Sequence, residues 1–353
     1  MLVSFVEATR QSFRFVSRRK STSPRQRRIA LAQILAFSVG LAPSLAFAQF
    51  SALDDPAARF EWRGQLRSKF QAEFKTRTAG GDSFESWTTT IAGDFGGPIN
   101  ESILVGIDAA YQYSNYEFRL DGAPGVPSVY GSAELPRDPW GPINTVDITP
   151  SATILIGDRF SLAAAIPIRY SGETGSRRSA VTGGASALVR WQITEGIRIG
   201  AGLGVTSQLE ENAETFPIIS FDWTITSDMQ LRTEGSWTQG GLATLLWGPN
   251  EAIRIRFSAG YERNRFRLDD NGFVADRNGI GEITSVPLEV GLRLRLYEDA
   301  YFDFHFGLAF AGHIRVENST GDKLYEQSYD PAPRIGLAIT LPFGLSSRSA
   351  PGM

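Results

Sequence analysis

The chain has no cysteine, only two histidines and, after residue 48, no long apolar run. Without thiols it can form neither a disulfide framework nor a thiolate metal site. A membrane-spanning helix needs roughly 20 consecutive apolar residues, and no segment beyond residue 48 approaches that length. These absences exclude a disulfide-stapled domain, and they exclude membrane helices from the main part of the chain.

The first 48 residues differ from the rest of the sequence. A basic stretch, RQSFRFVSRRKSTSPRQRR, precedes the apolar run IALAQILAFSVGLAPSLAFA, which ends in Ala46-Phe47-Ala48. This order predicts a secretory signal peptide cleaved after Ala48, with an uncleaved membrane anchor as the alternative. Cleavage would remove eight basic residues and one glutamate, which changes the formal net charge from −3 to −10. An acidic exported chain is not expected to bind nucleic acid.

The remaining sequence alternates between apolar and polar residues in segment after segment. In YFDFHFGLAF (301–310) every even position is large and apolar, whereas the odd positions are polar, ionisable or small. Similar alternation occurs in 62–76, 252–262 and 286–296. Because successive side chains of a strand point to opposite faces, the pattern predicts strands with one apolar and one polar face. No segment shows a sustained helical period, so we expect an all-β chain.

The number of alternating segments predicts about 14 antiparallel strands, with 12 as the alternative. The predicted strands are 61–76, 84–95, 101–118, 144–156, 159–171, 182–193, 197–208, 215–226, 229–238, 242–247, 252–267, 283–296, 300–316 and 330–343. Tight turns such as Gly157-Asp158 alternate with mostly longer polar connections such as 119–143 and 268–282. An up-and-down meander with short turns at one rim and long loops at the other is typical of outer-membrane barrels.

Aromatic residues concentrate near both ends of the predicted strands. Trp62 and Trp223 lie beside short turns, whereas Trp87 and Tyr261 lie toward long loops, and two such belts are typical of membrane interfaces. A soluble β-sandwich also alternates apolar and polar residues, but its strands usually have about 5–6 residues. The strands predicted here are about twice that length. No further sequence could cover so large an apolar wall, so we expect it to face lipid.

These features together resemble Gram-negative outer-membrane β-barrel proteins, most closely an uncharacterised barrel family that is a domain of unknown function. The resemblance covers about 60–343. It implies an outer-membrane location, contacts with lipid and lipopolysaccharide, and passage through periplasmic chaperones and the barrel assembly machinery. IGLAITLPF (335–343) resembles the aromatic-ended last strand that this machinery reads, and ten residues follow Phe343. The expected organisation is a signal peptide (1–48), a short periplasmic N-terminal segment (49–60), a single transmembrane antiparallel barrel (61–343) and a C-terminal tail (344–353).

If the apolar set faces lipid, the opposite set lines the lumen. The candidate lumen-lining residues are Arg63, Arg67, Lys69, Glu73, Arg169, Arg190, Arg198, Arg232, Glu234, Arg254, Arg256, Glu289, Arg293, Arg295, Asp303 and His305, and the same parity contains Asp94, Asp108, Asp147, Glu262 and Arg334. Basic residues predominate, which favours a water-filled conduit with a mild preference for anions. A salt-bridged lumen that neutralises itself is an equal alternative, because 14 strands lie between filled eight-stranded barrels and open porins.

The function that this pattern best supports is a passive pore or transporter for small polar solutes. A non-conducting structural or adhesive surface barrel is the second candidate. The third is a barrel hydrolase, with His313 as its catalytic candidate and Ser258 and Asp303 on the same inward parity, although no recognisable spacing links the three. We expect no enzyme activity, no cofactor and no metal site.

Two further features bear on transport. The longest loop, 121–143, would constrict the pore if it folded inward and would only cap it if it stayed outside. A long-chain fatty-acid transporter is a comparable 14-stranded barrel, but such barrels have an N-terminal plug of several tens of residues. Here only about 12 residues separate Ala48 from the first predicted strand, which argues against a plugged mechanism of that kind.

Overall fold

The computed structural model describes residues 61–79, 81–119, 139–236, 240–248, 250, 252–271, 276–297 and 300–345. The predicted signal peptide, the N-terminal segment, most of loop 121–143 and nearly all of the predicted tail lie outside the described residues. No helix in the described ranges is long and apolar enough to cross a membrane.

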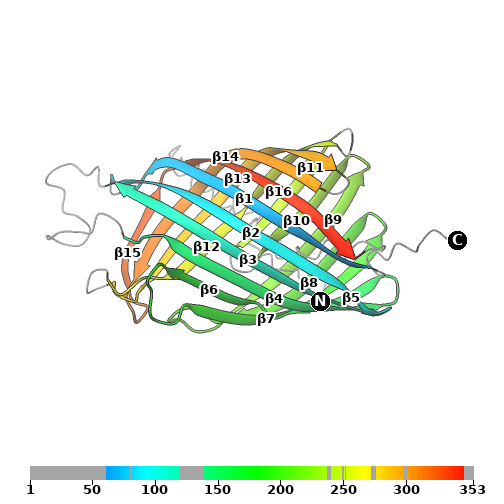
Figure 1. Ribbon diagram of the computed structural model, residues 1–353, viewed down its shortest axis with the longest axis horizontal. Helices are drawn as coiled ribbons and strands as arrows, with labels where there is room; N and C mark the ends of the chain where they lie inside the picture. The colour runs from blue at the N-terminus through cyan, green and yellow to red at the C-terminus, as the bar shows by residue number, and fades with distance from the viewer. Residues whose placement is uncertain are drawn as a thin grey trace, which may run out of the picture. The chain divides into compact units, whose positions relative to one another are not determined.

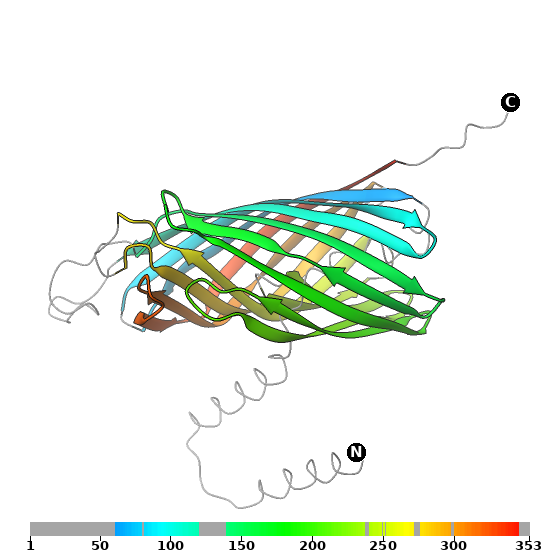
Figure 2. The same ribbon diagram turned by 90° about the horizontal axis from the view of Figure 1, so that it is seen from below.

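The described residues form a closed antiparallel barrel (Figures 1 and 2). Its strands are β1 (Trp62–Arg77), β2 (Ser83–Asn100), β3 (Ile103–Arg119), β4 (Ile143–Ile156), β5 (Phe160–Ala165), β6 (Ile168–Glu173), β7 (Val181–Thr194), β8 (Ile197–Thr206), β9 (Glu214–Thr226), β10 (Met229–Ser236), β11 (Gly240–Trp247), β12 (Ile253–Arg267), β13 (Ile280–Tyr297), β14 (Ala300–Glu317), β15 (Lys323–Tyr329) and β16 (Ala332–Leu345). The first and last strands pair from Trp62↔Leu345 to Glu73↔Arg334, which closes the cylinder.

Two of the barrel positions each hold a pair of shorter strands. β5 and β6 both pair with β4 and with β7, and β15 and β16 both pair with β14. The sixteen strands therefore make a 14-stranded barrel, which confirms the predicted number. The polar connection between the predicted strands 300–316 and 330–343 contains a further strand, β15, that the sequence pattern does not predict.

Proline explains the interruption between β5 and β6. Pro167 has no N–H to donate to a ladder, and the strand breaks at Ile166-Pro167. The neighbours nevertheless remain joined, since the Ile166 N–H donates to the Pro150 carbonyl (3.0 Å) and the Gly184 N–H donates to the Pro167 carbonyl (2.9 Å). The single strand predicted over 159–171 is therefore two strands in one continuous wall.

The outer face of the barrel is apolar along its middle. Large side chains such as Leu66, Phe70, Ile91, Leu203 and Phe306 are 43–63% exposed, and all belong to the apolar parity of their strands. Near the short turns the rings lie against one another: Trp62–Phe95 at 5.3 Å and Phe160–Trp191 at 5.9 Å between centroids. A closed ladder with an apolar exterior and aromatic residues at its rims is the architecture of a transmembrane barrel of the outer membrane.

Strand pairing in the barrel wall varies in length between β9 and β12. Within the described residues the β9–β10 ladder has four register pairs, from Met229↔Thr226 to Arg232↔Asp222. β12 continues past its last pair with β11, Gly240↔Glu262, and its end reaches β6 on the other side of the barrel at Arg267↔Gly172. The long-loop end of the barrel is therefore drawn together across the lumen.

A bulge in β14 inverts the direction of its side chains near the long loops. The register passes from Val286↔Phe310 to Thr284↔His313, so β14 contains one additional residue there, and Ala311 has a φ of 47°. One inserted residue moves every later side chain to the other face. The prediction that His313 faces the lumen is therefore wrong: His313 is exposed, whereas Ile314 is buried inside.

Candidate functional site: the lumen and its outer closure

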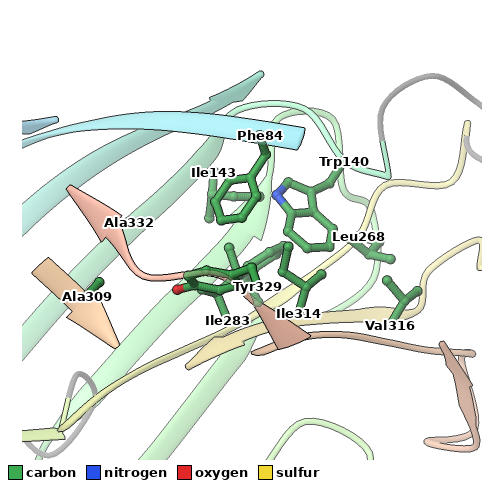
Figure 3. Packing of buried hydrophobic residues seen from close by; sticks show 11 residues of the cluster. Phe84, Trp140, Ile143, Leu268, Ile283, Ala309, Ile314, Val316, Tyr329 and Ala332 are labelled. Atoms are coloured by element: carbon green, nitrogen blue, oxygen red, sulfur yellow. The ribbon is translucent and has the colours of Figure 1, made fainter. Parts of the chain in front are cut away.

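Apolar side chains fill the lumen at its long-loop end (Figure 3). This apolar plug consists of Phe84, Trp140, Ile143, Phe266, Leu268, Ile283, Ala309, Ile314, Val316, Tyr329 and Ala332. Its members come from β2, β4, β12, β13, β14, β15 and β16 and from the segments that flank β4 and β12. The expectation that the inward set is polar throughout is wrong at this end of the barrel.

An aromatic chain, formed by three members of the plug and by Phe118, which packs against it, crosses the barrel from one wall to another. Ring centroids are 5.8 Å apart for Phe84–Phe118, 5.1 Å for Phe118–Trp140 and 5.1 Å for Trp140–Phe266. β3, which contains Phe118, and β12, which contains Phe266, are not neighbours in the sheet. Aromatic pairs at these separations add to the burial of their surfaces, so the chain holds opposite walls together.

A single carboxylate anchors two segments of the plug. Glu173, at the outer end of β6, accepts hydrogen bonds from the N–H groups of Gly141 and of Asp269, the second at 2.9 Å. Gly141 follows Trp140, and Asp269 follows Leu268, which are both in the plug. Loop 121–143 lies largely outside the described residues, but its last part, which includes Trp140, does enter the lumen.

An ionic network surrounds the outer end of β12. This outer ionic network consists of Arg178, Arg263, Arg265, Arg267, Glu210, Glu211, Glu214, Glu282 and Glu317. Its shortest contacts are Arg265 Nη2–Glu317 Oε2 at 2.6 Å and Arg267 Nη2–Glu210 Oε1 at 2.7 Å. It joins β12 to β13, to β14, to the start of β9 and to the segments before β7 and between β8 and β9. Removing one partner from such a buried pair is costly, because the other charge remains buried.

Deeper in the lumen, one arginine binds three carboxylates. The Arg334 side chain is fully buried and lies 3.0 Å from Glu262, 3.3 Å from Glu289 and 3.7 Å from Glu73. These residues come from β16, β12, β13 and β1, so the contacts reach beyond adjacent strands. The Arg169 guanidinium likewise donates to Asn264 Oδ1 at 2.7 Å, from β6 to β12. The lumen therefore neutralises part of its own charge, as one of the two sequence-based alternatives predicts.

The wall from β5 to β9 has a second apolar patch on its inner face. Ala163, Ala165, Leu188, Phe216 and Ile218 form this cluster. The β8 glycine between them, Gly204, has no side chain, and a Cβ there would lie 2.3 Å from the Phe216 ring. This part of the lumen is therefore filled.

A polar cavity of about 340 Å³ remains on the other side of the lumen. Half of the candidate residues line it: Arg67, Lys69, Glu73, Arg232, Arg256, Arg293, Asp303 and His305. Arg293 and Asp303 are joined at 2.8 Å. Asp94, Asp108 and Asp147, on β2, β3 and β4, also line the cavity.

The other candidate residues lie apart from this cavity. Glu289 is bound to Arg334, Arg169 is bound to Asn264, and Arg190 is buried. Toward the short turns, Arg63 pairs with Glu61 at 3.0 Å and Arg198 donates to Gln192 at 2.8 Å. Arg254 and Arg295 are partly exposed near the same rim, and the Glu234 side chain lies outside the described part of the chain.

His305 occupies a space that a glycine creates. A Cβ at Gly336 would lie 2.2 Å from Nε2 of the imidazole. The ring is 97% buried, and among the described residues neither nitrogen has a hydrogen-bond partner. Its nearest carboxylate oxygen, Oε1 of Glu289, is 3.9 Å from Nε2. No cluster of three or more metal-ligating side chains is present in the described ranges.

The fold and lumen define the class of protein: a closed outer-membrane β-barrel with a polar cavity. No protein-family model matches the chain, and neither does any curated protein. Solved structures similar to it include the Pseudomonas putida toluene transporter TodX, with 7% identity and a TM-score of 0.43 over 85% of this chain and 93% of that one.

Two other similar structures are also bacterial. An outer membrane channel from Pseudomonas putida F1 has 11% identity and a TM-score of 0.41, over 80% of this chain and 96% of that chain. The translocator domain of the autotransporter NalP from Neisseria meningitidis has 11% identity and a TM-score of 0.33, over 89% and 97%. Similarities this distant carry no information about what the present chain does.

Proposed function

We propose that the chain is a channel for small polar solutes whose outer end is closed at rest. The observation that carries this proposal is the cavity of about 340 Å³, which is lined by charged side chains and lies inside a closed barrel. A barrel with a purely structural role can fill its interior with side chains, as small barrels do. Here charged groups are instead arranged around a space large enough for a small solute.

Conduction through this channel requires the apolar plug to move. The plug is a separate layer above the cavity, and Trp140 and Leu268, two of its members, lie outside the strands. Trp140 can therefore leave the lumen without breaking a ladder, whereas Leu268 must first lose the hydrogen bond from its N–H to the Gly279 carbonyl (3.0 Å). The opening motion is a displacement of the Trp140 and Leu268 segments, which Glu173 holds in place.

The test is single-channel conductance in planar bilayers for the wild type and the variant Trp140→Ala/Phe266→Ala. We expect rare openings for the wild type and a mean conductance at least about tenfold higher for the variant, because ~1.4 kcal/mol removed from the closed state shifts its population tenfold. The matched control is Trp191→Ala/Phe257→Ala, which removes the same side chains from the lipid face. A plug variant that inserts but stays silent would overturn the proposal.

A non-conducting surface barrel is the second candidate, and the closed outer end favours it. β13 and β14 each have 18 residues, and with β15 they extend the wall at the long-loop end. Silence of both the wild type and the plug variant would support this function. The hydrolase hypothesis loses its basis, since the β14 bulge separates His313 from the inward faces of Ser258 and Asp303. We therefore propose a non-enzymatic role.

A further inference from the structure

The charged residues of the cavity are not mixed evenly around it. The wall formed by β2, β3 and β4 contributes Asp94, Asp108 and Asp147. These three strands contain a single basic residue, Arg119, at the outer end of β3. On this side of the cavity, which we call the acidic wall, three adjacent strands therefore contribute only negatively charged side chains to the lining.

Within the acidic wall, Asp147 lies opposite Arg169 of β6, whereas Asp94 and Asp108 have no basic residue opposite them in the β2–β3 ladder. Asp94 and Asp108 are directly opposite in the β2–β3 ladder, and like charges in such positions destabilise a sheet. Gln65 donates to Asp94 Oδ1 at 2.6 Å. Asp108 is 91% buried, and its Oδ2 has no hydrogen-bond partner among the described residues. This buried carboxyl oxygen therefore lacks a partner within the described structure.

The remaining lining of the cavity is mixed, but its carboxylates are paired: Asp303 with Arg293, and Glu73 and Glu262 with Arg334. Lys69 of β1, Arg232 of β10 and Arg256 of β12 also line the cavity. Lys69 and Arg256 act electrostatically on His305, whose imidazole lines the same cavity and has two nitrogens without hydrogen bonds in the described structure. We call Lys69, Arg232, Arg256 and His305 the basic wall. β5 to β9 separate Arg232 of β10 from the acidic wall on one side of the barrel, whereas Lys69 belongs to β1, which pairs with β2.

From these two walls we propose that the cavity binds small organic zwitterions, with the ligand ammonium on Asp94 and Asp108 and the ligand carboxylate on Lys69, Arg256 and His305. Walls of opposite sign orient a dipolar solute and favour it over an ion of either sign. A volume of about 340 Å³ suits a solute of amino-acid size. This inference rests on the proposed channel function and names its solute class.

The proposal is tested with three probes of equal length: 4-aminobutyrate, butyrate and butylamine. Each is added to the plug variant Trp140→Ala/Phe266→Ala in planar bilayers, and block of the ion current is measured. We expect 4-aminobutyrate to block at a concentration at least about tenfold lower than either singly charged probe, the factor expected for one charge-assisted contact. Calorimetric titration of the full-length wild type in detergent provides a second readout that does not depend on conduction.

Two substitutions in the plug-variant background separate the walls. Asp108→Asn is expected to abolish the advantage of 4-aminobutyrate over butyrate, because both then bind through the carboxylate alone. Arg256→Gln is expected to abolish its advantage over butylamine. The controls Asp222→Asn and Arg198→Gln make the same charge changes at inward positions that do not line the cavity, and they should leave the order of the probes unchanged.

The possible failures are distinguishable. If the plug variant conducts no current while the wild type still binds 4-aminobutyrate, the channel function is wrong and the binding site stands. If the variant conducts but the three probes block equally, the zwitterion site is wrong and the channel stands. Block by butylamine or by calcium ions alone would also overturn the inference, in favour of a cation site on the acidic wall.

Discussion

The two ends of the lumen differ in the polarity of their inward side chains and in the regularity of their backbone. On the short-turn side of the plug, the inward side chains around the cavity include polar ones such as Gln65, Arg67 and Lys69. Toward the long loops the inward side chains are apolar, and the backbone contains the β14 bulge and the breaks before β6 and β16. Alternation in the sequence therefore determines which face of each strand contacts lipid, but it does not determine which side chains fill the interior.

The largest effect is expected at the boundary between the two ends, where Arg334 binds three carboxylates. Arg334→Leu would leave Glu289 and Glu73, whose side chains are 6% and 12% exposed, without their cation. We expect a loss of about 3–5 kcal/mol in the free energy of unfolding, measured as the urea midpoint of the heat-modifiable band on gels. Arg198→Gln at the short-turn rim is the control. Equal midpoints would mean that the lumen ion pairs are dispensable.

The inverted parity of β14 can be tested directly. Ile314→Ala removes a buried plug side chain and should cost about 2–5 kcal/mol, whereas His313→Ala removes an exposed one and should change stability by no more than about 0.5 kcal/mol. The same urea midpoints provide the comparison. A larger loss of stability for His313→Ala than for Ile314→Ala would show that His313, not Ile314, faces the lumen and that β14 has no bulge between Phe310 and His313.

A smaller effect is expected at the Glu173 anchor. Glu173→Gln keeps one acceptor oxygen but loses the charge and one of the two hydrogen bonds to the Gly141 and Asp269 N–H groups. The expected loss is about 1–3 kcal/mol, confined to the plug. It should therefore increase the opening frequency in bilayers with little change in the urea midpoint. Glu117→Gln, an exposed change on β3 near the same rim, is the matched control.

The weakest contrast concerns the β9–β10 seam. Its four register pairs compare with eight between β10 and β11. Amide hydrogen exchange should therefore be faster in β9 from Phe216 to Ser220 than in β11, since exchange follows local opening. Equal protection of the amides in both strands would show that the β9–β10 seam is not a weak point of the barrel wall.

The sequence predicts the strands well because each barrel strand is long and its outer face is continuously apolar. It also predicts the apolar outer wall, and half of the candidate lumen-lining residues do line the cavity. The plug is partly predictable, since Phe84, Phe266 and Ile283 occupy the inward parity of their own strands. These apolar residues lie at inward positions near the long-loop ends of their strands. That local exception to the alternation is the sequence feature that predicts the plug.

The rest could not be predicted from alternation. Ile314 and Val316 enter the lumen because of a single inserted residue, and the sequence does not mark where a bulge takes it up. The outer ionic network joins residues far apart in the chain, such as Arg265 and Glu317 at 2.6 Å. Such pairings depend on the path of β12 across the barrel, which follows from the short β10–β11 hairpin.

The β1–β16 seam has a consequence for how the barrel is made. Its partners, such as Trp62 and Leu345, are almost as far apart in sequence as two described residues can be. Contacts of such separation form late, because the intervening chain must first be ordered. The cylinder cannot be completed until its last strand has been exported, and until then β1 has an open edge that can pair with foreign strands. Closure of the barrel is therefore a step of the finished polypeptide, not of the growing one.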